Sequence, residues 1–176
     1  MCIPSSCLSA GRKYPVPIAV DLSINKIILR DAQSAEKVLG EEIELDGMVV
    51  PKAHYYNKKK TEILTIVFHN GDQRNEFSEF IVRSSTEMIR GPIHRLPAVS
   101  YFKTGKGVRL GITKKELSKR LGRFYVEKEN SEDKTTVLTY DISEKPTERY
   151  DWSLYYGRYV FKDGRLIEFA FGFQYP

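Results

Sequence analysis

The chain has 176 residues, 41% of them hydrophobic and 29% charged, which is typical of a folded globular protein and excludes a low-complexity or disordered one. Basic residues outnumber acidic ones by 28 to 23, and the net charge of +5 is spread along the chain, with its densest run at Lys58 to Lys60. No recognised RNA or DNA motif accompanies this excess, so nucleic acid is not expected as a partner. No run approaches the roughly 18 apolar residues that a transmembrane helix needs.

Residues 1–17 are expected to be a flexible N-terminus or the remnant of a signal peptide. Both cysteines, Cys2 and Cys7, lie in this segment, so no disulfide can hold the rest of the fold together. The small apolar stretch that ends in Leu8-Ser9-Ala10 is followed at once by Arg12 and Lys13, as at the end of a secretory signal. This pattern predicts export to the periplasm, the cell envelope or the medium. A disordered N-terminus of a cytosolic protein is the alternative.

A short helix is predicted over residues 31 to 39. Asp31 is a suitable N-cap, because its carboxylate can accept a hydrogen bond from a backbone amide of the first turn. Ala35 and Leu39 lie four residues apart and share one face, and Gly40 is placed to end the helix.

A second helix, predicted over residues 113 to 121, repeats the first in length, apolar face and stop signal. Thr113 and Glu116 have the spacing of a capping box, in which each side chain accepts a hydrogen bond from the backbone amide of the other. Leu117 and Leu121 form the apolar face, and the glycine that follows ends the helix. The two predicted helices are therefore repeats of the same sequence pattern.

Strands follow each helix in a second repeated pattern. Residues 63–71 (ILTIVFHNG) and 155–164 (YYGRYVFKDG) align on Val-Phe-x-Asn/Asp-Gly, which is typical of a strand that runs into a tight turn. We therefore expect an α+β fold of two tandem helix-plus-antiparallel-sheet repeats, residues 18–90 and 107–176, joined by a connector over residues 91–106. Because each unit has too little apolar surface to be stable alone, the repeats should share a continuous sheet or an interface.

The last hairpin can be aligned in two ways. A two-residue turn at Asp163-Gly164 would give both faces a mixed character, whereas a three-residue loop that includes Lys162 shifts the pairing by one residue. The second register pairs Arg158 directly with Glu168 and gathers the aromatic side chains on the other side, so we adopt it. The core face would then carry Tyr155, Tyr159, Phe161, Ile167, Phe169, Phe171 and Phe173.

The opposite face of this hairpin is interpreted as a protein-binding surface. It mixes aromatics, small residues and an ion pair, which suits neither a fully solvated face nor a core face. Its predicted contact residues are Trp152, Leu154, Tyr156, Arg158, Val160 and Glu168, continued in the first repeat by Thr65 and Val67. The alternative is that a neighbouring loop covers Trp152 and Tyr156.

Two segments resemble the β-lactamase inhibitor protein (BLIP) family. They are Gly111 to Leu117 (GITKKEL), at the start of a helix, and Phe161 to Leu166 (FKDGRL), where a strand enters its turn. The resemblance implies two tandem repeats that form a concave sheet and grip a protein partner. Small outer-membrane-assembly lipoproteins of the SmpA/OmlA type share the helix signature in a single copy. The family's disulfides are absent here, and Arg158 and Val160 stand where it places His and Trp, so inhibition of a β-lactamase is not predicted.

No catalytic residue, metal or cofactor is predicted. His54, His69 and His94 lack metal-ligand spacing, and the chain has no nucleophile elbow or phosphate-binding glycine loop. The expected function is that of an exported, non-catalytic module that binds an unknown protein, with a monomer as the simplest state. The alternative is a small-ligand carrier or an unrecognised enzyme with its site between the repeats. A deep closed pocket would favour the alternative, and an open aromatic surface would favour protein binding.

Overall fold

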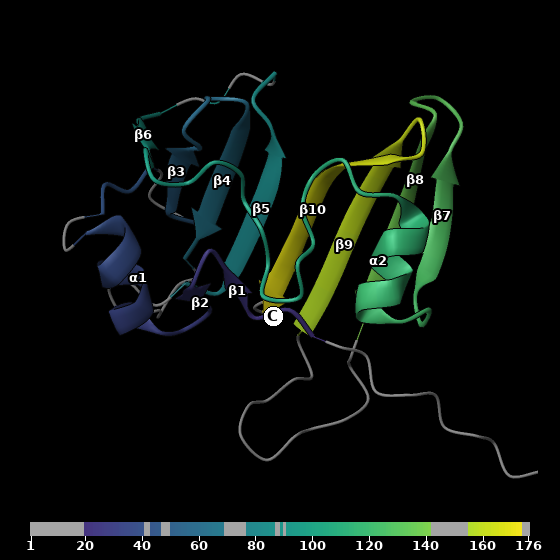
Figure 1. Cartoon of the computed structure of the whole chain (residues 1–176), viewed down its shortest axis with the longest axis horizontal. Coiled ribbons are helices and arrows are strands. Elements are labelled where there is room, and N and C mark those ends of the chain that lie inside the picture. Colours follow the sequence, from purple (N-terminus) through teal and green to yellow (C-terminus); the bar gives the residue numbers. More distant parts are fainter. Residues whose placement is uncertain are drawn as a thin grey trace, which may run out of the picture.

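The computed structural model describes residues 20–40, 43–46, 50–68, 77–86, 89, 91–141 and 155–173. Eight strands in these ranges form one sheet in the order β6-β3-β4-β5-β10-β9-β8-β7, and β1 and β2 form a small second sheet (Figure 1). Neighbours in the large sheet are antiparallel, except that β3 and β6 are parallel. The strands are β1 (Ser23–Ile24), β2 (Ile27–Ile28), β3 (Lys52–Tyr56), β4 (Glu62–Val67), β5 (Glu79–Ser84), β6 (Ile93–Arg95), β7 (Val126–Asn130), β8 (Thr135–Asp141), β9 (Tyr155–Lys162) and β10 (Arg165–Phe173).

The two helices, α1 (Ala32–Leu39) and α2 (Lys114–Leu121), confirm the predicted helix positions. Asp31 caps α1 by accepting a hydrogen bond from a backbone amide of the first turn at 3.0 Å. Thr113 and Glu116 form the predicted capping box at the start of α2. Within the described ranges, no helix has the length and apolar character needed to cross a membrane.

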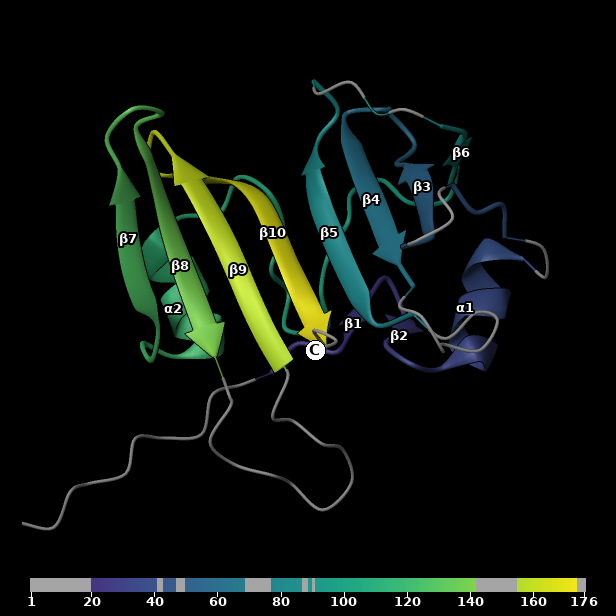
Figure 2. The ribbon, with the colours of Figure 1, turned by 180° about the vertical axis from the view of Figure 1, so that it is seen from behind.

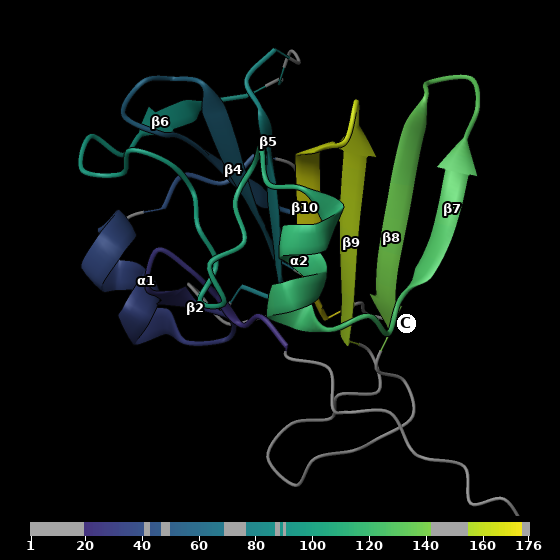
Figure 3. The same cartoon turned by 45° about the vertical axis from the view of Figure 1, so that its right-hand side comes forward.

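One face of the large sheet is covered by a layer that consists mostly of irregular chain. Both helices, the β1–β2 hairpin and the segment 97–112 lie on this side of the sheet (Figures 1 and 3). All of these elements place apolar side chains in the same core as the aromatic residues of β9 and β10. The covering residues buried there include Ile24, Ile27, Ala35, Phe102, Val108, Ile112, Leu117 and Leu121. The opposite face, toward the viewer in Figure 2, is called the helix-free face below.

The fold class predicted from the sequence is wrong. The protein is mostly β, with 44% of its residues in strands and 13% in helices, and one eight-stranded mixed sheet takes the place of two helix-plus-sheet repeats. Each helix has only eight residues, so the hairpin and the connector supply much of the layer that packs on the sheet. In addition, β6 lies in the predicted connector but joins the sheet edge in parallel with β3. The repeated helix signals located the helices without revealing how little of the fold they form.

Strands β5 and β10 form the central seam of the sheet. Their register runs from Arg83 opposite Glu168 to Glu79 opposite Gly172. In the core beneath the seam, the ring of Phe80 meets that of Phe171 edge-on at a centroid distance of 5.6 Å. Strands β5 and β10, which lie on either side of the segment 91–141 in the chain, are therefore direct neighbours in the sheet.

The register predicted for the β9–β10 hairpin is wrong both at its turn and beyond it. Lys162 pairs with Arg165, so the turn has two residues, Asp163 and Gly164. Both have positive φ, 50° and 73°, as the tight turn of a twisted hairpin requires. A β-bulge at Ile167 then shifts the pairing by one residue.

The bulge explains how the aromatic residues still share one face. It inverts the alternation of β10 beyond the turn, so that Phe169, Phe171 and Phe173 lie on the same side as Tyr155 and Tyr159, and all five are buried. Ile167, predicted in the core, is the bulged residue and is 38% exposed. These aromatic residues therefore lie on one face, as predicted, but the bulge puts them there and not the predicted register.

Candidate functional site

The centre of the helix-free face is a set of side chains in cross-strand rows. Directly paired residues point to the same side of a sheet, so the strand register fixes each row. One row contains Thr65, Ile81, Ala170, Arg158, Thr139 and Val126, from β4 to β7. The next contains Ile63, Arg83, Glu168, Val160 and Val137. Figure 2 shows this side of the sheet.

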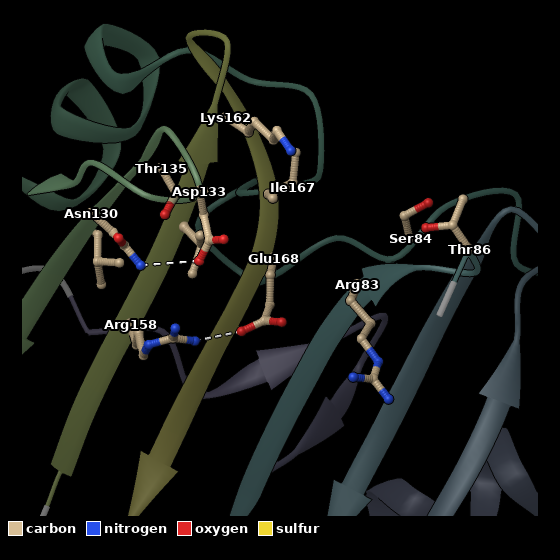
Figure 4. Close-up of a pocket in the computed structure, with 12 residues that line it drawn as sticks. Arg83, Ser84, Thr86, Asn130, Asp133, Thr135, Arg158, Lys162, Ile167 and Glu168 are labelled. Carbon is tan, nitrogen blue, oxygen red and sulfur yellow. Dashed lines mark hydrogen bonds and ion pairs between the residues drawn. The ribbon is translucent and has the colours of Figure 1, made fainter. Parts of the chain in front are cut away.

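Arg158 and Glu168 form an ion pair on this face, from β9 and β10 (Figure 4). They were predicted to be directly opposite each other, but the bulge places Arg158 opposite Ala170 and Glu168 opposite Val160. The contact is therefore diagonal. Their side chains are 45% and 24% exposed, and ion pairs of this kind contribute little stability, so the pair mainly fixes two charges at the surface.

A hollow of about 530 Å³ opens beside this ion pair (Figure 4). One wall comes from the end of β5 and the residues after it, and the other from strands β7 to β10 with the β7–β8 turn. It lies where the pairing of β5 with β10 ends, next to the bulge. Nine of its twelve lining residues are polar or charged, and the full set is Arg83, Ser84, Thr86, Asn130, Asp133, Thr135, Val137, Arg158, Val160, Lys162, Ile167 and Glu168.

Tyr156, in β9, lies one row away from Arg158. Its side chain reaches across β10 toward β5. It pairs with Gly172, which in turn pairs with Glu79, and its side chain is hydrogen-bonded to that of Glu79. Burial, followed by the charge of Glu79 and this hydrogen bond, raises the pKa of Tyr156 far above its ordinary value. Its phenol therefore stays protonated and can act as a donor at physiological pH.

The predicted binding residues divide into three groups. Arg158 is exposed, and Tyr156 and Glu168 are half-buried on the helix-free face. Val160, Thr65 and Val67 point to the same face, but only 7%, 4% and 3% of their surfaces are exposed. These three have little surface to offer a partner. Trp152 and Leu154 lie outside the described residues.

Two exposed apolar residues near the start of β7 were missed by the sequence analysis. Phe124 is 57% exposed and Val126 72%. Tyr125 between them packs its ring on that of the buried Tyr140 at 5.4 Å, so its neighbours point away from the core. The signal was available: an apolar-aromatic-apolar triplet directly after a helix stop cannot bury all three side chains in an extended chain.

The described histidines show no catalytic or metal-binding arrangement. His54 is buried, with its Nδ1 3.0 Å from the Thr65 hydroxyl, and burial lowers its pKa. His94 lies at the sheet edge, 3.2 Å from the Glu44 carboxylate. In the part of the chain that the structure describes, no group of three or more His, Cys, Asp or Glu could hold a metal ion. His69 and both cysteines lie outside the described residues.

Asp21 is a buried carboxyl group on the other side of the sheet. It is 1% exposed, and its Oδ1 accepts a hydrogen bond from the Lys106 amide at 2.7 Å. Burial raises its pKa to about 6, although hydrogen bonds from Thr104 and Lys106 and the charge of Arg120 oppose the shift. Asp21 is enclosed and does not line the hollow, so its titration bears on stability.

Searches of protein-family models, of curated proteins and of solved structures found no match to this chain. The resemblance to the β-lactamase inhibitor protein family therefore remains a prediction based on two short segments of the sequence.

Proposed function

We propose that the chain is an exported, non-catalytic module that binds a protein through the helix-free face of strands β7 to β10. The observation that carries the proposal is the apolar surface at Phe124 and Val126, at the β7 end of the row that contains Arg158. Protein interfaces combine apolar and aromatic anchors with arginine and a polar surround. Export rests on the sequence of residues 1–17, which lie outside the described residues.

The location differs from the one predicted from the sequence. Val160, Thr65 and Val67 are too buried to be anchors, so the proposed surface moves away from β4 and toward the β7 edge. Arg158, Glu168 and Tyr156 remain part of it. The β7 edge itself carries Glu127, Lys128 and Glu129, and charged residues on an edge strand oppose pairing with another strand. Binding is therefore expected through side chains on the face and not through β-strand addition.

The Phe124→Ser/Val126→Ser double variant tests the proposal. Immobilised protein is used to capture partners from the native organism's envelope and medium, and bound proteins are quantified by mass spectrometry. Truncating interface anchors costs on the order of 1 to 2 kcal/mol each, so the specific partner should be captured at least about tenfold less. The melting temperature should be almost unchanged, because both side chains are exposed.

The matched control is Leu45→Ser/Val50→Ser, which removes two exposed apolar side chains from the other half of the chain. These residues are 45% and 41% exposed, so the control reduces surface hydrophobicity in a similar way. Equal losses in the two double variants would show that capture depends on hydrophobicity in general. That outcome, or full capture by the Phe124/Val126 variant, would refute the proposed surface.

A small-ligand carrier is the second candidate, and the hollow beside Arg158 favours it. Its volume lies within the roughly 300 to 1,000 Å³ of small-molecule sites, and its walls come from β5 as well as from the last four strands. Lys162 and Arg158 would then contact an anionic group. A small anion that raises the melting temperature of the wild-type chain but not of Lys162→Gln would favour this function over protein binding.

A further inference from the structure

The basic excess of the chain is not spread along it, as expected above, but is concentrated in one segment. Residues 103–123 contain eight basic residues and one acidic residue, a net charge of +7, whereas the whole chain carries +5. The remaining residues therefore have a net charge of −2. This segment comprises the end of the connector, α2 and the turn after it.

Seven of the eight basic side chains are exposed. They are Lys103, Lys106, Arg109, Lys115, Lys119, Arg120 and Arg123, which together are called the basic face below. The eighth, Lys114, is half-buried and paired with Glu127. Glu116, the acidic residue of the segment, is held by Thr113 in the capping box. The charge of the basic face is thus largely uncompensated within its own segment.

The cations come from different parts of the segment but belong to one side of the molecule. Segment 97–112 and α2 both lie over the covered face of the sheet (Figures 1 and 3). They also touch, since the Arg120 guanidinium donates to the Lys106 carbonyl oxygen at 3.5 Å. Arg165, at the start of β10, adds a further cation beside them, because its guanidinium donates to the Gly111 carbonyl oxygen at 3.1 Å.

We propose that the basic face docks on an anionic lipid surface. Clusters of four to eight Lys and Arg residues are attracted to anionic headgroups, and each cation near the surface contributes. Leu117 and Leu121 are buried against the sheet, so α2 presents its charged positions outward instead of inserting an apolar face. The contact is therefore electrostatic and reversible.

The type of cation favours lipid over a protein partner. Four of the seven are lysines, and lysine is depleted in protein interfaces because ordering its long chain is unfavourable. In the described part of the chain, the side chains of Lys103, Lys115, Lys119 and Arg123 have no hydrogen-bond or ion-pair partner that would fix them. Mobile lipid headgroups can follow such side chains, whereas a protein surface requires a fixed geometry.

Nucleic acid is less well matched to the same residues. Binding of single strands uses exposed aromatic rings on which bases stack. The exposed rings next to this segment are Tyr101 and Phe124, one at each end, and Arg109 already lies over Tyr101, 5.3 Å from the ring centroid. Helix α2 has only eight residues and packs lengthwise on the sheet by its leucines, which limits its entry into a major groove.

Docking by the basic face leaves the helix-free face directed away from the lipid. The sheet lies between the two surfaces, because the residues of the basic face belong to the layer that covers the opposite side. A partner protein could therefore bind while the chain is at the membrane. The two proposals rest on different residues, and either can fail alone.

The test uses co-sedimentation of the full chain with vesicles of phosphatidylcholine alone or of phosphatidylcholine mixed with phosphatidylserine. The wild-type chain should bind only the anionic vesicles, and added salt should release it. In the triple variant Lys115→Gln/Lys119→Gln/Arg123→Gln, each lost cation should weaken binding about fivefold, or roughly a hundredfold in total. These side chains are exposed, so circular dichroism should confirm an unchanged fold.

The matched control is Lys58→Gln/Lys59→Gln/Lys60→Gln, which removes the same charge from exposed positions between β3 and β4. It should weaken vesicle binding by less than about threefold, because these lysines belong to the β3–β4 turn and not to the basic face. Equal weakening by both triple variants would show that vesicle binding depends only on the net charge of the chain, and this would overturn the proposal. So would failure of the wild type to bind anionic vesicles, or tighter binding to an oligonucleotide at matched phosphate concentration.

Discussion

Gly172→Ala should destabilise the protein by about 3 kcal/mol or more, because it forces apart the central seam of the sheet. A Cβ atom at this position would lie 2.2 Å from the Ser78 carbonyl oxygen and 2.6 Å from the Cα of Glu79. Both are backbone atoms of the chain entering β5, and that same carbonyl oxygen accepts a hydrogen bond from the Phe173 amide at 2.8 Å. The clash therefore cannot be relieved by rotating a side chain. Urea unfolding followed by circular dichroism measures the change.

Gly164→Ala is the control for this variant. Gly164 also has positive φ, 73°, but no atom lies within 4 Å of the position that its Cβ would take. Only backbone strain remains, about 1 to 2 kcal/mol. If the two substitutions have the same effect, the close approach of β10 to β5 is not what makes glycine necessary at position 172.

Asp21→Asn should stabilise the protein by roughly 3 kcal/mol at neutral pH. Burial raises the pKa of this carboxyl group from 3.8 to about 6 in the folded chain. The folded state therefore binds a proton more readily than the unfolded state, and stability falls as pH rises from about 4 to about 6. Asparagine keeps an acceptor for the Lys106 amide without the buried charge.

The pH dependence distinguishes this effect from a general stabilisation. The advantage of Asp21→Asn should disappear below about pH 4, where the wild-type carboxyl group is protonated in both states. Unfolding free energies measured at several pH values give the curve. The exposed control Glu132→Gln should change stability by less than about 0.5 kcal/mol at each pH. A wild-type protein that is at least as stable as Asp21→Asn at neutral pH would contradict the account.

Local features of the sequence predicted the helices correctly because caps and stop signals act over a few residues. The capping box of Thr113 and Glu116 and the helix ends at Gly40 and Gly122 appear in the structure as expected. The fold class failed because it depends on pairing between distant segments. Nothing local shows that residues 93–95 pair in parallel with β3.

The hairpin register shows why a non-local constraint can mislead. Asp163-Gly164 is a strong signal for a two-residue turn, and it was set aside because that register mixed the two faces. The β-bulge at Ile167 resolves the conflict, since it inverts the alternation of β10 within the strand. A single sequence gives no reliable sign of a β-bulge. The assumption that side chains alternate strictly between the two faces therefore led to the wrong pairing.

The candidate site was predicted only in part. The alternation placed Tyr156, Arg158 and Glu168 on the correct face, but it could not reveal that Thr65 and Val67 are buried there. The basic face was missed for a different reason: its cations are separated by apolar and glycine residues, so no run stands out. Folding brings the connector and α2 together and makes one surface of them.

Photo-cross-linking from Val126 tests the central claim most directly. A photoreactive amino acid at this 72% exposed position lies on the helix-free face, and the same group at Lys119 lies on the basic face. In extracts of the native organism, irradiation should join one discrete protein to the Val126 position and none to the Lys119 position. The same adduct from both positions, or a protein adduct from Lys119 alone, would contradict the assignment of the partner to the helix-free face.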